Sequence, residues 1–157
     1  MKIATVDFEK ILMNYKPYQE SLEYLESYKN EFSSSMDKIR EEMQRIVNSS
    51  RSLLLDEKTK GDNIQRMREL QLKASESESE FRSDFSEKQN DELDKNFKKV
   101  VDIITNLANG TNSNGSGFDL ILNKNSVVFQ KSNLEITDDV INEISKLGMI
   151  SETQVMD

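Results

Sequence analysis

The sequence predicts a mostly α-helical protein with a small β body and one long antiparallel helical hairpin. Three observations support this fold class. Between residues 17 and 109 the only proline is Pro17, at the start, and the only interior glycine is Gly61. The apolar residues of the first half of this span recur about every 3.5 residues, as in a coiled coil. Short β-prone runs flank the span on both sides.

These signals divide the chain into successive segments. The division expected from the sequence is residues 1–16 as the first part of the body, 17–109 as the hairpin with its tip at about 51–66, 110–117 as a flexible linker, 118–148 as the rest of the body, and 149–157 as a tail.

The N-terminal segment alternates apolar and polar side chains, which predicts a strand over about residues 2–8. Asp7 is then placed to cap a short helix over residues 9–14, because its carboxylate can accept hydrogen bonds from free backbone N–H groups. We interpret Asp7 as a cap rather than a catalytic acid. Lys16-Pro17 suits the start of a new helix.

The outgoing helix carries a seam of apolar residues that packs along a partner helix. The seam consists of Tyr18, Leu22, Leu25, Tyr28 or Lys29, Phe32, Met36, Ile39, Met43 and Ile46. Packing is the simpler interpretation of the leucines and isoleucines. Met36 and Met43 also suit a surface that accepts varied partners, because methionine side chains are flexible.

The bend of the hairpin is expected at the polar turn from Asp56 to Gly61. Just before it, Leu53, Leu54 and Leu55 stand together, and one seam cannot bury all three. Basic residues outnumber acidic ones around this bend, in a chain whose net charge is −8. The basic tip comprises Arg51, Lys58, Lys60, Arg66 and Arg68.

The return helix contains a strongly acidic stretch over residues 74–94, where apolar residues are sparse. We expect this arm to be thinly packed and mobile, because little apolar area offsets the entropy of ordering it. A solvated acidic face is the simpler interpretation of the charges, and a specific acidic site is the alternative. Residues 97–108 restore a strong apolar stripe.

The C-terminal part begins after a Gly- and Asn-rich stretch that resembles a calcium loop only in part, since its first and twelfth positions lack ligands. Two strands follow, over residues 118–123 and 126–130, with a turn at Lys124-Asn125. Thr137 is the expected N-cap of a last helix that Gly148 ends. The tail has no clear pattern.

Composition excludes several functions. The net charge of −8 argues against nucleic acid as a partner and limits membrane contact to a peripheral role of the basic tip. The chain has no His and no Cys, so the commonest general base, the thiol nucleophile and the zinc-thiolate site are missing. No phosphate-binding loop is present, and we expect neither an enzyme nor a cofactor. Met1 is followed at once by the first strand, so we expect either no signal peptide or a mature form with an added start Met.

Three short strands cannot close an independent sheet, so the β body is expected to pair with other copies of the chain. The candidate residues of this assembly core are Ile3, Val6, Leu120, Leu122 and Val128.

Nearly the whole chain resembles the Skp/OmpH-like periplasmic chaperones. The resemblance rests on KIATVDFEKIL at the start, on the long helical pair, and on two runs near the end, DLILNKNSV at Asp119–Val127 and SNLEITDDV at Ser132–Val140. It implies a jellyfish-shaped homotrimer in which each chain gives three strands to the body and one helical tentacle. The tentacles would enclose a cavity that holds unfolded outer-membrane β-barrel proteins without ATP. A periplasmic location follows from the resemblance alone.

A holdase needs many weak apolar contacts, and the candidate client-binding residues are Met36, Met43, Met67, Phe81 and Phe85. Packing between the two helices explains several of these equally well. Familiar members of the family are often basic, so an acidic chain implies weaker charge attraction to clients, or attraction confined to the tip. The alternatives are a coiled-coil scaffold without chaperone activity and a cytosolic prefoldin-like holdase, although the C-terminal runs argue against the second.

Overall fold

The computed structural model describes residues 1–110 and 117–152. The chain divides into two compact units. Residues 1–23 and 90–157 form the terminal unit, and residues 24–89 form the central unit. Two long helices, α2 (Lys16–Ser50) and α3 (Glu57–Ala108), contribute residues to both units. The Gly- and Asn-rich linker and the tail of the sequence lie largely outside the described residues.

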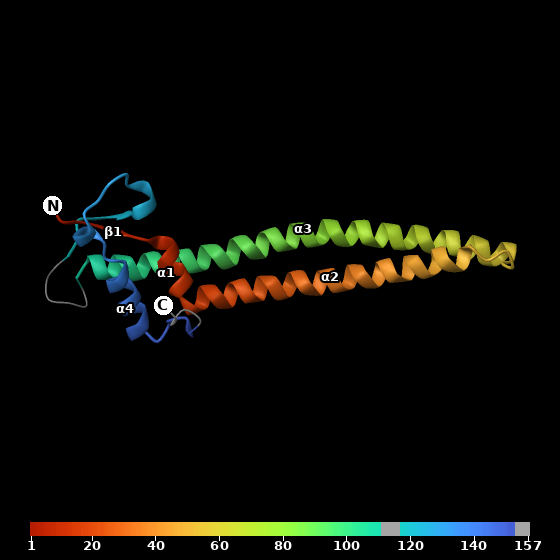
Figure 1. Ribbon diagram of the computed structural model, residues 1–157, viewed down its shortest axis with the longest axis horizontal. Coiled ribbons are helices and arrows are strands. Elements are labelled where there is room, and N and C mark those ends of the chain that lie inside the picture. The colour runs from red at the N-terminus through yellow and green to blue at the C-terminus, as the bar shows by residue number, and fades with distance from the viewer. Residues whose placement is uncertain (111–116, 153–157) are drawn as a thin grey trace. The chain divides into compact units, whose positions relative to one another are not determined.

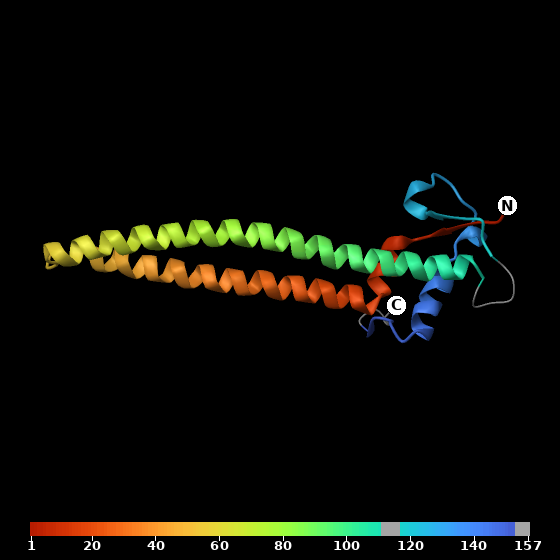
Figure 2. The same cartoon turned by 180° about the vertical axis from the view of Figure 1, so that it is seen from behind.

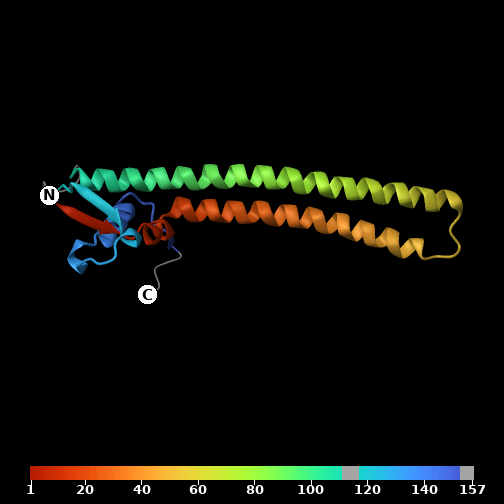
Figure 3. The same cartoon turned by 90° about the horizontal axis from the view of Figure 1, so that it is seen from above.

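The terminal unit contains a two-stranded parallel sheet. Strand β1 (Ile3–Val6) pairs with β2 (Leu120–Asn123), as Figure 3 shows. Ile3 lies opposite Leu120 in the register of the pair. On the other side of β1, the Ile136 N–H donates to the Thr5 carbonyl oxygen over 2.9 Å. Strand β1 therefore has neighbours on both sides, whereas the outer edge of β2 has no strand partner among the described residues.

Two short helices complete this unit. In α1 (Phe8–Asn14), the Asp7 carboxylate accepts from the Lys10 N–H over 3.0 Å, which confirms the predicted cap. Helix α4 (Thr137–Lys146) buries Val140 and Ile144 fully. Apolar residues from β1, α1, α3 and α4, together with the cap residues Tyr15 and Ile136, form one core: Ala4, Val6, Ile11, Leu12, Tyr15, Val100, Ile103, Ile136, Val140 and Ile144.

The predicted second strand at residues 126–130 is wrong for the single chain. Residues Lys124–Ser126 form a turn of 3₁₀ helix, and residues 127–130 have no regular structure. The Asn123 side chain accepts from the Asn125 N–H over 3.3 Å, which closes this turn instead of a hairpin. The described residues thus form a sheet of two strands instead of the three strands predicted. In this sheet β2 pairs with β1, which is distant in the sequence, and not with the segment that follows it.

The sequence predicted that Thr137 is the N-cap of α4, and this prediction is wrong. It is the first residue of the helix, and Ile136 occupies the cap position without a side-chain hydrogen bond. The Thr137 hydroxyl accepts from the Asp7 N–H over 2.8 Å and lies 3.1 Å from a Glu135 carboxylate oxygen. Its polar group therefore ties the start of α4 to the start of α1.

The central unit is an antiparallel pair formed by the adjoining parts of α2 and α3, which lie side by side in Figures 1 and 3. Leu25, Met36 and Ile39 of the predicted seam are buried, and Leu70 of α3 clusters with Met36 and Ile39, with 1% of its surface exposed. The seam prediction is confirmed for these residues.

The bend lies earlier than the sequence predicted. Helix α2 ends at Ser50, α3 begins at Glu57, and residues 51–56 form the loop between them (Figure 2). The Asp56 carboxylate accepts from the Thr59 N–H over 2.7 Å, so Asp56, the last residue of the loop, caps the start of α3. Gly61 lies inside α3, and a Cβ atom added there would meet nothing within 4 Å.

Candidate functional site

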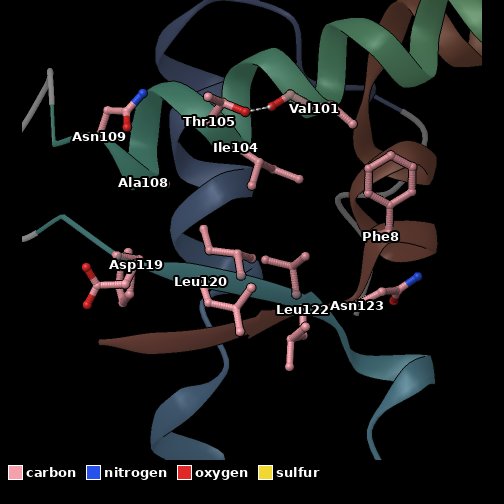
Figure 4. Close-up of a pocket in the computed structure, with 13 residues that line it drawn as sticks. Phe8, Val101, Ile104, Thr105, Ala108, Asn109, Asp119, Leu120, Leu122 and Asn123 are labelled. Carbon is pink, nitrogen blue, oxygen red and sulfur yellow. Dashed lines mark hydrogen bonds between the residues drawn. The ribbon is translucent and has the colours of Figure 1, made fainter. Parts of the chain in front are cut away.

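An apolar groove of about 420 Å³ opens in the terminal unit between β2 and the end of α3 (Figure 4). Strand β2 lines it with Leu120 and Leu122, which alternate along the strand and so share one face. Helix α3 contributes Val101 and Ile104. Leu120 is 41% exposed, Leu122 38% and Val101 49%, so the groove presents apolar surface to whatever lies outside the chain.

The five predicted assembly residues differ in exposure. Leu120 and Leu122 lie on the groove, and Val128 is fully exposed on the irregular segment that follows it. Ile3 is half-buried, and Val6 is only 3% exposed because it packs in the chain's own core. The structure thus leaves Leu120, Leu122 and Val128 available for contact with another molecule, and Val6 much less so.

Two further features of the same segment went unnoticed in the sequence. Phe129, next to Val128, is 80% exposed. The buried Oε1 atom of Gln130 has no hydrogen-bond partner in the described structure. A buried acceptor without a donor is rare in proteins. The two adjacent exposed apolar residues indicate a surface that another molecule can cover.

In the central unit, four aromatic rings form a stack between the two helices. Tyr28 and Phe32 come from α2, and Phe81 and Phe85 come from α3. Phe32 and Phe81 lie nearly parallel with their centroids 4.0 Å apart, and Tyr28 stacks against Phe81 at 5.5 Å. We call these residues the aromatic stack.

The five candidate client-binding residues all contribute to helix packing or lie beside it. Met36 is only 5% exposed and packs against Ile39 and Leu70, while Met43 packs at the edge of the same cluster. Met67 is half-buried. Phe81 and Phe85 belong to the aromatic stack. The structure brings these residues into the helix pair, and their contact with clients stays a prediction.

The loop at residues 51–56 carries the most exposed leucines of the described chain. Leu53 is 99% exposed and Leu54 is 95% exposed. Sequence reasoning did not select them as a site, although it noted that one seam cannot bury three adjacent leucines. A pair of fully exposed leucines is a contact surface for another apolar partner.

The residues of the basic tip are not equivalent. Arg66 lies 2.7 Å from a Glu42 carboxylate oxygen on α2 and 3.4 Å from Glu69, and the hydrogen bond to Glu42 raises the pKa of Arg66. Lys60 pairs with Glu57 over 3.4 Å. In contrast, Arg51, Lys58 and Arg68 form no ion pair with any residue that the structure describes. Within the basic tip, these three carry positive charge that no described carboxylate neutralises.

A polar layer interrupts the apolar contact between α2 and α3 in the terminal unit. The Ser21 hydroxyl donates to the Glu92 carboxylate over 2.6 Å, and the Asn96 side-chain amide donates to Ser21 over 2.8 Å. Ser21 is 4% exposed and Asn96 is 1% exposed. Two hydrogen bonds lower the pKa of Glu92: the bond from Ser21 has the larger effect, and the bond from Lys95 the smaller.

The described residues contain no group of three or more His, Cys, Asp or Glu side chains that could hold a metal ion. Within the same part of the chain, neither long helix has an apolar stretch sufficient to span a bilayer. Exposed apolar residues lie on the groove, on loops and on the long helices, where Ile64 is 56% exposed and Leu72 is 60% exposed. This arrangement is typical of proteins that bind other polypeptides.

Residues 2–144 match the family model described as outer membrane protein (OmpH-like). The chain therefore belongs to the OmpH-like family. Membership indicates a periplasmic chaperone of outer-membrane proteins rather than an enzyme. No curated protein matches the sequence.

Proposed function

We propose that this protein is an ATP-independent holdase that acts as a homotrimer and keeps unfolded outer-membrane β-barrel proteins soluble in the periplasm. The observation that carries the proposal is the family match over residues 2–144. The client occupies a cavity between the helix pairs of three chains, where many weak apolar contacts hold it reversibly. Leu53 and Leu54 contribute such contacts because their side chains are almost fully exposed.

The terminal unit supports the proposed self-association. The outer edge of β2 is unpaired among the described residues, and open edges of small sheets pair readily with other chains. Beside this edge lie Leu120 and Leu122, and Val128 and Phe129 follow with most of their surface exposed. Another copy of the chain would cover these residues.

Contact with a membrane is peripheral in this proposal and involves the basic tip. Of the five residues of the basic tip, Arg51, Lys58 and Arg68 lack an ion pair within the described structure, and the chain as a whole carries a net charge of −8. Because each basic residue near an anionic surface adds only about 1 kcal/mol, such a contact is weak.

Light scattering tests the holdase activity. A urea-denatured outer-membrane β-barrel protein is diluted into buffer with and without this protein, in the absence of nucleotide. We expect the protein to suppress aggregation at a ratio of three chains to one client. An intact trimer that leaves aggregation unchanged would instead favour the alternative of a coiled-coil scaffold, which the buried seam of the central unit also fits.

A further inference from the structure

A second groove, in the central unit, lies against the aromatic stack. Its volume is about 290 Å³, and Tyr28, Phe32 and Phe81 line it with their rings. Ligand pockets for drug-sized molecules usually measure ~300–1,000 Å³, so this groove suits one or two side chains rather than a large ligand. The small side chains of Ser35 and Ser77 leave the groove open.

The other lining residues of this groove are acidic. Glu31 comes from α2, while Glu80 and Asp84 come from α3. All three are exposed, and none forms an ion pair with another residue in the part of the chain that the structure describes. Many other carboxylates of the two helices do pair, for example Glu42 with Arg66 and Asp37 with Arg40. The groove therefore combines aromatic rings with unneutralised negative charge.

One cation already contacts the aromatic stack. The Lys88 ammonium group lies over the Tyr28 ring, 5.4 Å from its centroid. This distance is within the range of a cation–π interaction, in which the negative face of the ring attracts the cation. One face of the Tyr28 ring is thus accessible to an ammonium group. A second cation in the groove would gain the same attraction and that of three carboxylates.

We propose that this groove binds lysine and arginine side chains of unfolded client polypeptides, especially where an aromatic residue is adjacent. The aliphatic stem and the neighbouring aromatic side chain contact the stack, and the cationic head group lies between the rings and the carboxylates. The inference rests on the proposed holdase function and gives the acidic stretch of α3 a role in selecting clients. An acidic chaperone of this kind prefers client segments with positive charge.

The test measures the affinity of the full chain for a short dye-labelled peptide of lysine, phenylalanine and serine by fluorescence anisotropy. Matched peptides replace each lysine with glutamine or with glutamate. We expect the lysine peptide to bind about tenfold more tightly than the glutamine peptide, and the glutamate peptide to bind most weakly. Equal affinities for the lysine and glutamine peptides would overturn the inference.

A pair of charge-matched variants locates the effect. The groove variant carries Glu31→Gln, Glu80→Gln and Asp84→Asn. The control variant carries Asp62→Asn, Glu76→Gln and Glu87→Gln, which are exposed residues of the same unit that do not line the groove. Both remove three negative charges, so general attraction changes equally. We expect the groove variant to bind the lysine peptide about tenfold more weakly than the control variant, and equal affinities would overturn the inference.

The two proposals fail in different ways. If wild-type protein does not suppress aggregation of a denatured β-barrel protein, the holdase function is wrong. If wild-type protein suppresses aggregation but the two charge-matched variants bind the lysine peptide equally well, only the role of the groove is wrong. Circular dichroism of both variants checks that the helices are retained.

Discussion

At the scale of single residues, the polar layer of Ser21, Glu92 and Asn96 is the most specific contact between the two long helices. A buried asparagine at a helix contact is satisfied in only one alignment of the two helices, so such residues fix register. Here the Asn96 amide reaches both Ser21 and the backbone carbonyl oxygen of Glu92. The layer therefore sets how α2 and α3 align within the terminal unit.

Ser21→Ala is expected to lower the free energy of unfolding by about 1–2 kcal/mol, because it leaves the buried Asn96 amide with one partner fewer. The double variant Ser21→Ala/Asn96→Leu is expected to recover much of this loss, since both polar partners are then removed together. Urea denaturation at one fixed protein concentration measures both values. If the effects of the two substitutions on the free energy of unfolding simply add, Ser21 and Asn96 are not energetically coupled, and the account of the layer is contradicted.

Glu92 also predicts a pH dependence. Its pKa is lowered in the folded chain by the Ser21 and Lys95 hydrogen bonds, so the ionised carboxylate stabilises the fold above its ordinary pKa of 4.5. This contribution is lost as the pH falls through 4.5 toward the lower folded pKa. Urea midpoints measured across this range should fall less steeply for Glu92→Gln than for wild type. Identical slopes would show that the hydrogen bonds do not favour the ionised form.

At the scale of elements, the start of α3 shows where sequence reasoning failed and why. Gly61 in a polar stretch indicated a bend, yet Asp56 caps the helix five residues earlier and the helix continues through the glycine. A capping hydrogen bond depends on the local path of the chain, which composition does not reveal. The second strand at residues 126–130 failed similarly, because Asn123 closes a 3₁₀ turn.

Gly61→Ala separates the two positions of the bend. Inside a helix with open space around it, alanine should stabilise the protein by up to about 1 kcal/mol. Gly148→Ala is the matched control, because Gly148 has a φ of 72°, which alanine adopts only with strain. Thermal unfolding should therefore show a higher Tm for the first variant and a lower Tm for the second. A lower Tm for Gly61→Ala would place the bend at Gly61.

At the scale of the whole molecule, the sequence predicted the helical pair, its seam and a strand at the position of β2 correctly. Periodic apolar residues such as Met36 and Ile39 report directly on the helix face that is buried. The groove against the aromatic stack could not be predicted, because it depends on how Tyr28 and Phe32 meet Phe81 from a distant helix. The sequence also selected Val6 as an assembly residue, although the single chain already buries its side chain.

Assembly is tested by Leu120→Asp and Leu122→Asp. Each places a charge on the apolar groove, and in the proposed trimer this charge would be buried without a partner. Both substitutions are therefore expected to dissociate the trimer and, at the same time, to abolish the holdase activity. Leu72→Asp is the matched control, because Leu72 is 60% exposed on α3 of the central unit. Light scattering gives the native mass. Trimers that survive the β2 substitutions would show that the assembly face lies elsewhere.

The most direct measurement is native mass spectrometry of the protein mixed with a urea-denatured outer-membrane β-barrel protein, without nucleotide. The proposed function predicts a complex of three chains with one client, alongside empty trimers. A single-chain mass, or trimers that remain empty while the client precipitates, would contradict it.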